Sequence, residues 1–75
     1  MKTNTEFKLQ TYYKSELAMM YFPQSDKRNA VQNLKRWIRK CTQLTRELKV
    51  AGYMPTRKFY SRREVELIVK YLGEP

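Results

Sequence analysis

Residues 26–41, DKRNAVQNLKRWIRKC, decide how this chain folds. Their apolar side chains recur at positions i, i+4, i+7, i+8 and i+11, which is the spacing of one face of an α-helix. This face predicts a helix over residues 26–41 that packs on a hydrophobic core. We expect its tryptophan to pack in that core rather than stack on a base, and its cysteine to be a small core residue. The apolar residues of the face are Ala30, Leu34, Trp37, Ile38 and Cys41.

The opposite face of the same helix is almost wholly cationic. A rotation of 100° per residue places on it long side chains that donate hydrogen bonds. Arg and Gln can contact the edges of guanine and adenine, whereas Lys more often meets phosphate. We interpret this face as a DNA-binding surface, and a charged face that is only solvated is the alternative. Its residues are Arg28, Gln32, Lys35, Arg36 and Arg39.

A second, shorter helix is predicted before this one, over residues 14–22. Pro23 ends it, because proline lacks an N–H and disfavours the helical conformation in the residue before it. Ser25 is then expected to cap the helix that follows. Two helices joined by a tight turn form a helix-turn-helix arrangement, whose second helix can lie in the major groove of DNA.

Two more helices are predicted on the C-terminal side. Thr42 is expected to cap a helix over residues 43–51. Ser61 and Glu64 have the spacing of a capping box, in which each side chain accepts the other residue's backbone N–H. This box predicts a fourth helix over residues 62–72.

Two short segments are predicted to pair as a β ribbon. Residues 6–10 alternate between apolar and polar side chains, and residues 57–60 combine two cations with two aromatics. The sequence therefore predicts a mainly α fold with a minor β element, a small winged helix-turn-helix-like domain. We expect this single domain over residues 6–75, and a disordered N-terminus over residues 1–5.

Four further cations are candidates for DNA contacts. Arg57 and Lys58 stand where a winged helix-turn-helix domain places its wing against the backbone or minor groove; an edge strand guarded by charge is the alternative. Arg62 and Arg63 oppose the dipole of the predicted fourth helix. A phosphate bound at the N-terminus of that helix would explain them, and plain solvation is the alternative.

Composition narrows the classes of function. The chain has 16 Lys and Arg against 7 Asp and Glu, a net charge of +9, which favours an anionic partner. One Cys and no His exclude a Cys/His zinc site, a disulfide within the chain and a Ser-His-Asp triad. We therefore expect no enzyme activity, no catalytic residue, no metal and no cofactor. The longest apolar run, residues 17–22, is far shorter than the ~20 residues that span a bilayer; with no signal peptide in view, we expect a cytoplasmic protein.

Five segments resemble a family of short Bacteroidetes proteins catalogued only as a domain of unknown function. The resemblance covers residues 7–75 and implies a bacterial origin and an ordered small domain, but no activity. The segments are KSELA at 14–18, YFP at 21–23, LKRWI at 34–38, AGY at 51–53 and VELIVKYLGEP at 65–75.

A shorter resemblance concerns the junction between the predicted wing and the last helix. Residues 57–61, RKFYS, followed by Glu64, Val65 and Ile68, look like this junction in MerR-type and excisionase-type DNA-binding domains. The chain departs from that pattern because a whole helix, residues 43–51, stands between the basic helix and the wing.

Together these features predict a protein that binds duplex DNA, in a regulatory or architectural role. The main alternative is a protein-interaction module, such as a mobile-element or phage accessory protein, whose basic face meets an acidic partner. A third hypothesis is binding to RNA or to a single strand.

Overall fold

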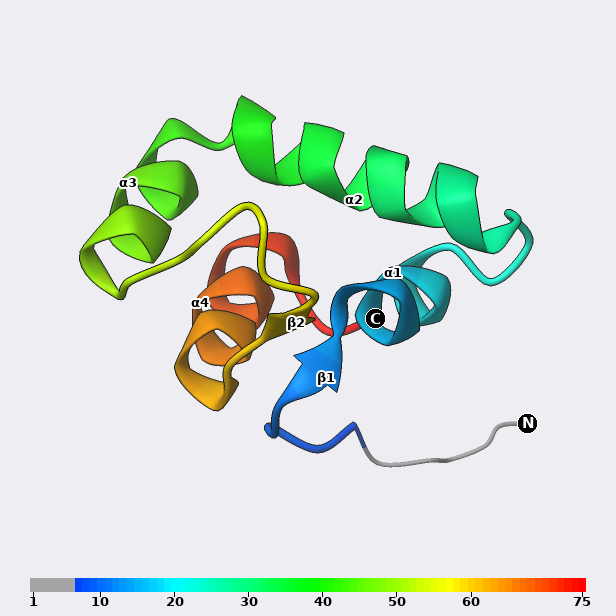
Figure 1. Ribbon diagram of the computed structural model, residues 1–75, viewed down its shortest axis with the longest axis horizontal. Coiled ribbons are helices and arrows are strands. Elements are labelled where there is room, and N and C mark those ends of the chain that lie inside the picture. Colours follow the sequence, from blue (N-terminus) through cyan, green and yellow to red (C-terminus); the bar gives the residue numbers. More distant parts are fainter. Residues whose placement is uncertain (1–6) are drawn as a thin grey trace.

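The computed structural model describes residues 7–75, which form four helices and a two-stranded antiparallel sheet (Figure 1). This confirms the prediction of a mainly helical domain with a minor β element and a winged helix-like fold. The predicted disorder of residues 1–5 lies outside the described residues. In chain order the elements are β1 (Tyr12–Tyr13), α1 (Lys14–Tyr21), α2 (Lys27–Lys40), α3 (Thr42–Val50), β2 (Phe59–Tyr60) and α4 (Arg62–Leu72).

Helix α2 runs along one side of the domain (Figure 1), and residues of its predicted apolar face are buried. Ala30, Leu34 and Ile38 are buried along it. The predicted cap is wrong by one residue. Asp26, not Ser25, caps the helix, and its carboxylate accepts the N–H of Asn29 at 2.8 Å. A charged acceptor at this position also interacts favourably with the helix dipole.

Helix α1 ends where the sequence predicts. The N–H of Phe22 donates to the carbonyl of Ala18 at 2.9 Å, and Pro23 follows in the turn. The turn leads directly into α2, so α1 and α2 are consecutive helices joined by a short turn. The prediction of a helix over residues 14–22 is confirmed to within one residue.

Helix α3 follows α2 after a single residue. Cys41, rather than Thr42, is the cap residue, and Thr42 is already helical, so the predicted cap is wrong. The bend is held by the hydroxyl of Thr45, which donates to the carbonyl of Ile38 at 2.9 Å. Beyond α3, Gly52 takes a φ of 92°, a conformation that other residues rarely adopt, and the chain turns back towards β2.

The sheet pairs a later segment than predicted. Tyr12 lies opposite Tyr60 and Tyr13 opposite Phe59, whereas residues 7–10 form no strand and residue 6 lies outside the described residues. The pairing at 12–13 runs straight into α1, where the N–H of Lys14 donates to the carbonyl of Lys58 at 2.9 Å. In this register Tyr60 is buried in the core.

Helix α4 begins with the predicted capping box. The Ser61 hydroxyl accepts the N–H of Glu64 at 3.3 Å, and the Glu64 carboxylate accepts the N–H of Ser61 at 2.8 Å. The box is confirmed, and so is the predicted helix over residues 62–72.

Ten side chains from α1, α2, α3, β2 and α4 form the hydrophobic core. Trp37 is not among them: it is 43% exposed and packs its ring against the edges of Phe22 and Tyr21, so its predicted core position is wrong. Its place at the border of the apolar face leaves one side of the indole in solvent. The core residues are Leu17, Ala18, Ala30, Leu34, Ile38, Leu44, Leu48, Tyr60, Val65 and Ile68.

Candidate nucleic-acid interface

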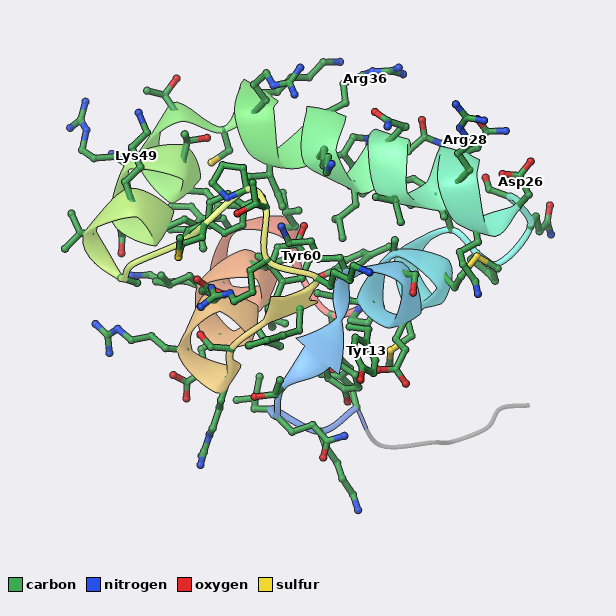
Figure 2. All side chains as sticks on the ribbon, viewed as in Figure 1. Tyr13, Asp26, Arg28, Arg36, Lys49 and Tyr60 are labelled. Atoms are coloured by element: carbon green, nitrogen blue, oxygen red, sulfur yellow. The ribbon has the colours of Figure 1, made fainter. Side chains whose placement is uncertain are left out.

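One side of α2 carries a row of long polar side chains. Arg28, Gln32, Lys35 and Arg39 follow one another at steps of four, three and four residues, so they share one side of the helix. All are exposed except Lys35, which is half-buried. Figure 2 shows Arg28 projecting from α2 away from the rest of the domain.

Arg36 lies beside this row on the outer face of α2. It is exposed, and one of its guanidinium nitrogens lies 3.5 Å from the side-chain oxygen of Asn33. In Figure 2 it points outward on the same side of the molecule as Arg28. The structure therefore places all five cationic and amide side chains predicted on α2 at the surface, and their contact with DNA stays a prediction.

Three neighbouring hollows extend the row beyond α2. The first lies between α1, α2 and the loop before β2; the second shares Lys35 and Pro55 with it; the third shares Arg39 and Thr45 with the second and reaches α3. None of the described acidic residues lines any of the three. We call the exposed and half-buried cations along them that make no ion pair within residues 7–75 the basic band: Lys58, Lys35, Arg39, Arg46 and Lys49.

Two cations of the basic band, Arg46 and Lys49, are not among the site residues predicted from the sequence. They lie on α3, and the bend at Cys41 sets this helix against the end of α2. Both are one or two turns beyond Thr42 on the same side of α3. The helical spacing of Arg46 and Lys49 is visible in the sequence. Only the bend at Cys41 shows that the two side chains continue the row on α2.

The Tyr53 hydroxyl lies close enough to several charged side chains for them to shift its pKa. Burial raises the pKa of this hydroxyl; the charge of Lys35 lowers that pKa, Glu64 raises it, and Arg57 and Arg39 lower it. Cations from α2 and from the loop before β2 therefore act on the same phenol.

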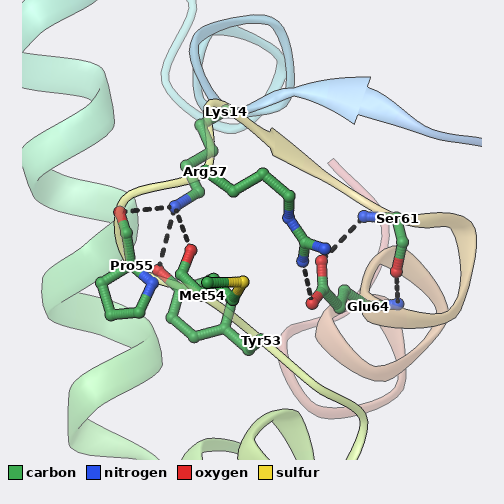
Figure 3. A network of polar contacts seen from close by, with 7 residues as sticks. All are labelled: Lys14, Tyr53, Met54, Pro55, Arg57, Ser61 and Glu64. Atoms are coloured by element: carbon green, nitrogen blue, oxygen red, sulfur yellow. Dashed lines mark hydrogen bonds and ion pairs between the residues drawn. The ribbon is translucent and has the colours of Figure 1, made fainter.

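A buried lysine holds the loop before β2. Lys14, at the start of α1, is only 7% exposed, and its Nζ donates to Tyr53 Oη at 3.3 Å, to the Met54 carbonyl at 3.3 Å and to the Pro55 carbonyl at 3.1 Å (Figure 3). The ammonium also lies over the rings of Tyr53 and Tyr60. Lys14 therefore fixes the path of residues 53–55 against α1.

Arg57, predicted as a wing residue that contacts DNA, points into the domain instead. Its guanidinium forms an ion pair with Glu64, whose side chain is fully buried, and its plane lies over the ring of Phe59 (Figure 3). The buried carboxylate needs a cation, which explains why the arginine turns inward. Arg57 is therefore not part of the basic band. Lys58, its neighbour, is exposed and remains available at the rim of the first hollow.

Arg62 and Arg63 are exposed, but carboxylates accompany them. Nε of Arg62 lies 4.0 Å from the carboxylate of Glu66, and Arg63 lines a hollow that also contains Glu47. The Glu64 carboxylate already sits at the N-terminus of α4. Figure 1 shows this first turn of α4 on the side of the domain away from α2. The structure does not bring the two arginines together with the row on α2, but Arg63 lines the same hollow as Arg46 of the basic band.

Two other classes of site, a membrane span and a metal site, are absent from the described residues. No helix within residues 7–75 has the length and apolar character needed to cross a membrane. No three side chains of His, Cys, Asp or Glu in the same range lie close enough together to hold a metal ion.

A protein-family model described as "Domain of unknown function (DUF4248)" matches residues 8–75. The match covers more than nine tenths of the chain, so the chain belongs to this family. No curated protein and no solved structure matches it.

Proposed function

We propose that this member of a family of unknown function binds duplex DNA, with α2 against the major groove and the basic band against the phosphates. The observation that carries the proposal is the band itself. Five cations from α2, α3 and the loop before β2 line three adjoining hollows, and no described carboxylate lies among them. Such a surface attracts a polyanion and repels cations along its whole length.

The chemistry of the side chains suggests which of them contact bases and which contact phosphates. Arg28, Gln32 and Arg36 project from a rigid helix whose other face is anchored in the core. They can reach base edges, where Arg pairs with guanine and Gln with adenine. The five cations of the basic band flank them and supply phosphate contacts, which set position and affinity but carry no base information.

The test is a titration of a fluorescently labelled duplex of about 20 base pairs, two helical turns, with binding followed by anisotropy at several salt concentrations. Five to seven phosphate contacts predict that log K falls against log[salt] with a slope of about −4 to −6. The variant Arg39→Gln plus Arg46→Gln should reduce the magnitude of this slope by about two. The control Lys8→Gln plus Lys70→Gln removes the same charge from exposed positions outside the basic band and should leave the slope unchanged.

Two results would overturn the proposal. The first is no duplex binding at low salt. The second is an equal loss of slope in the two variants, which would mean that net charge alone drives association. A partner that stays bound to the protein after nuclease treatment, together with the first result, would support the protein-interaction alternative. A preference for single strands or for RNA at equal salt would support the third hypothesis.

A further inference from the structure

The first of the three hollows is built by segments far apart in the sequence. It has a volume of about 350 Å³ and lies between the first turn of α1, the middle of α2 and the loop before β2. Cations stand at its floor and at its rim, and hydroxyl groups stand between them. The residues that matter below are Lys14 and Arg57 on the floor, Lys35 and Lys58 at the rim, and the hydroxyls of Ser15 and Thr56.

The floor of this hollow holds a positive charge that no carboxylate in contact neutralises. The ammonium of Lys14 is bonded only to a hydroxyl and two carbonyls, and it makes no ion pair with any described residue. Arg57 differs, since Glu64 balances its charge. Buried charges in proteins are normally paired, so an unbalanced buried cation favours an anion nearby.

The rim has the free donors that such an anion needs. The three N–H groups of Lys14 are already used, so its contribution is the charge alone. Within residues 7–75 the side chains of Lys35 and Lys58 make no hydrogen bond and no ion pair, and both line the hollow. Ammonium groups with hydroxyls beside them suit the several acceptor oxygens of a phosphate group.

We propose that this hollow is a phosphate-binding site in which Lys35 and Lys58 contact the oxygens and Lys14 supplies a fixed charge beneath them. This inference rests on the proposed function: the phosphate belongs to the DNA backbone beside the groove that α2 enters. Because Lys14 bonds the loop through its side chain and the Lys58 carbonyl through its backbone N–H, the backbone that carries Lys58 is held against α1 before the ligand arrives. A phosphate held there fixes how far along the groove α2 sits.

The experiment has two arms, because free phosphate and a backbone phosphate share the same chemistry. In the first arm, thermal unfolding is compared in sodium phosphate and in sodium chloride of equal ionic strength. The proteins are the unmodified chain, Lys35→Gln plus Lys58→Gln, and the charge-matched control Lys8→Gln plus Lys70→Gln. Phosphate stabilises folded proteins in general, so the informative quantity is the difference between variants. We expect phosphate to raise the melting temperature of the unmodified chain and the control more than that of the Lys35/Lys58 variant.

In the second arm, the same three proteins bind the labelled duplex over a range of salt. The Lys35/Lys58 variant should lose about two units of slope, and the control none. Equal stabilisation of all three proteins by phosphate, with equal slopes for the variant and the control, would overturn the phosphate site. If the duplex binds, but the Lys35/Lys58 variant and the control have equal salt slopes, the phosphate site is overturned and the proposed function is not. Stabilisation by phosphate that needs Lys35 and Lys58, without any duplex binding, would support the site for a free phosphate and overturn the proposed function.

Discussion

Arg57 and Glu64 form an ion pair that joins the loop before β2 to the first turn of α4, and the carboxylate of this pair is fully buried. The same carboxylate accepts the N–H of Ser61, so one side chain caps α4 and holds the arginine. The ion pair thus fixes the orientation of the loop relative to α4. On the other side of the loop, Lys14 binds the carbonyls of Met54 and Pro55.

The first prediction concerns this pair. Arg57→Gln leaves a buried carboxylate without its cation, and breaking a buried pair in this way costs about 3–5 kcal/mol. We expect a large fall in the free energy of unfolding, measured by urea denaturation. Arg62→Gln is the control, because Arg62 is exposed and its neighbour Glu66 lies 4.0 Å away. A loss below about 0.5 kcal/mol is expected there, and equal losses in the two variants would contradict the structural role of Arg57.

A second prediction ranks two apolar residues of α2. Leu34 is 1% exposed, so Leu34→Ala should cost about 2–5 kcal/mol through lost burial and the cavity left behind. Trp37→Ala removes a larger side chain, but Trp37 is already 43% exposed and its main contacts are with Phe22 and Tyr21. We expect it to cost less than Leu34→Ala, about 2 kcal/mol. Urea unfolding of both variants checks the order, and the reverse order would place Trp37 in the core after all.

The sequence predicts what depends on local rules. The apolar period of residues 26–41, the proline after α1 and the Ser61–Glu64 box each act within a few residues, and each marks a helix that the structure contains. The strand at Tyr12–Tyr13 could not be obtained in this way. Its position depends on which residues meet Phe59 and Tyr60 across the fold, and no local pattern contains that information.

The burial of Lys14 and Glu64 could have been predicted from their positions in the sequence. Lys14 precedes Leu17 and Ala18 by three and four residues, and Glu64 precedes Ile68 by four, so both lie on the apolar faces of their helices. A charge on such a face points to a buried partner. Which partner it has depends on the loop before β2, whose path only the folded structure shows.

The third prediction is a loss of stability in alkali caused by a buried tyrosine. Burial raises the pKa of Tyr60 well above its ordinary value of 10. Below pH 10 the folded and unfolded chains both keep the phenolic proton; above it, only the unfolded chain releases the proton, so folding is disfavoured progressively as pH rises towards the folded pKa. The effect is up to about 1.4 kcal/mol per pH unit. Urea unfolding of the unmodified chain and of Tyr60→Phe at pH 9 to 12 should show a shallower decline in the variant, and parallel declines would contradict the prediction.

The fourth prediction separates stability from binding on the outer face of α2. Arg36→Ala and Arg39→Ala should leave the melting temperature nearly unchanged, because both side chains are exposed and make no ion pair within residues 7–75. Both should weaken duplex binding. Melting curves and anisotropy titrations on the same samples test this. A lowered melting temperature with unchanged affinity for the duplex would mean that the arginines stabilise the fold and do not bind DNA.

The last prediction compares two pairs of arginines that carry the same charge. Arg62→Gln plus Arg63→Gln relieves an unfavourable interaction with the dipole of α4 but removes the neighbour of Glu66, and each effect is a few tenths of a kcal/mol. The free energy of unfolding should therefore change little. Because Glu64 already supplies negative charge at the start of α4, we expect the salt slope of duplex binding to stay the same in this variant. Arg39→Gln plus Arg46→Gln, within the basic band, should lose about two units of slope. A loss of slope in the Arg62/Arg63 variant, uniform across DNA sequences, would instead show that a phosphate lies at the N-terminus of α4 and that the DNA-binding surface extends beyond the basic band.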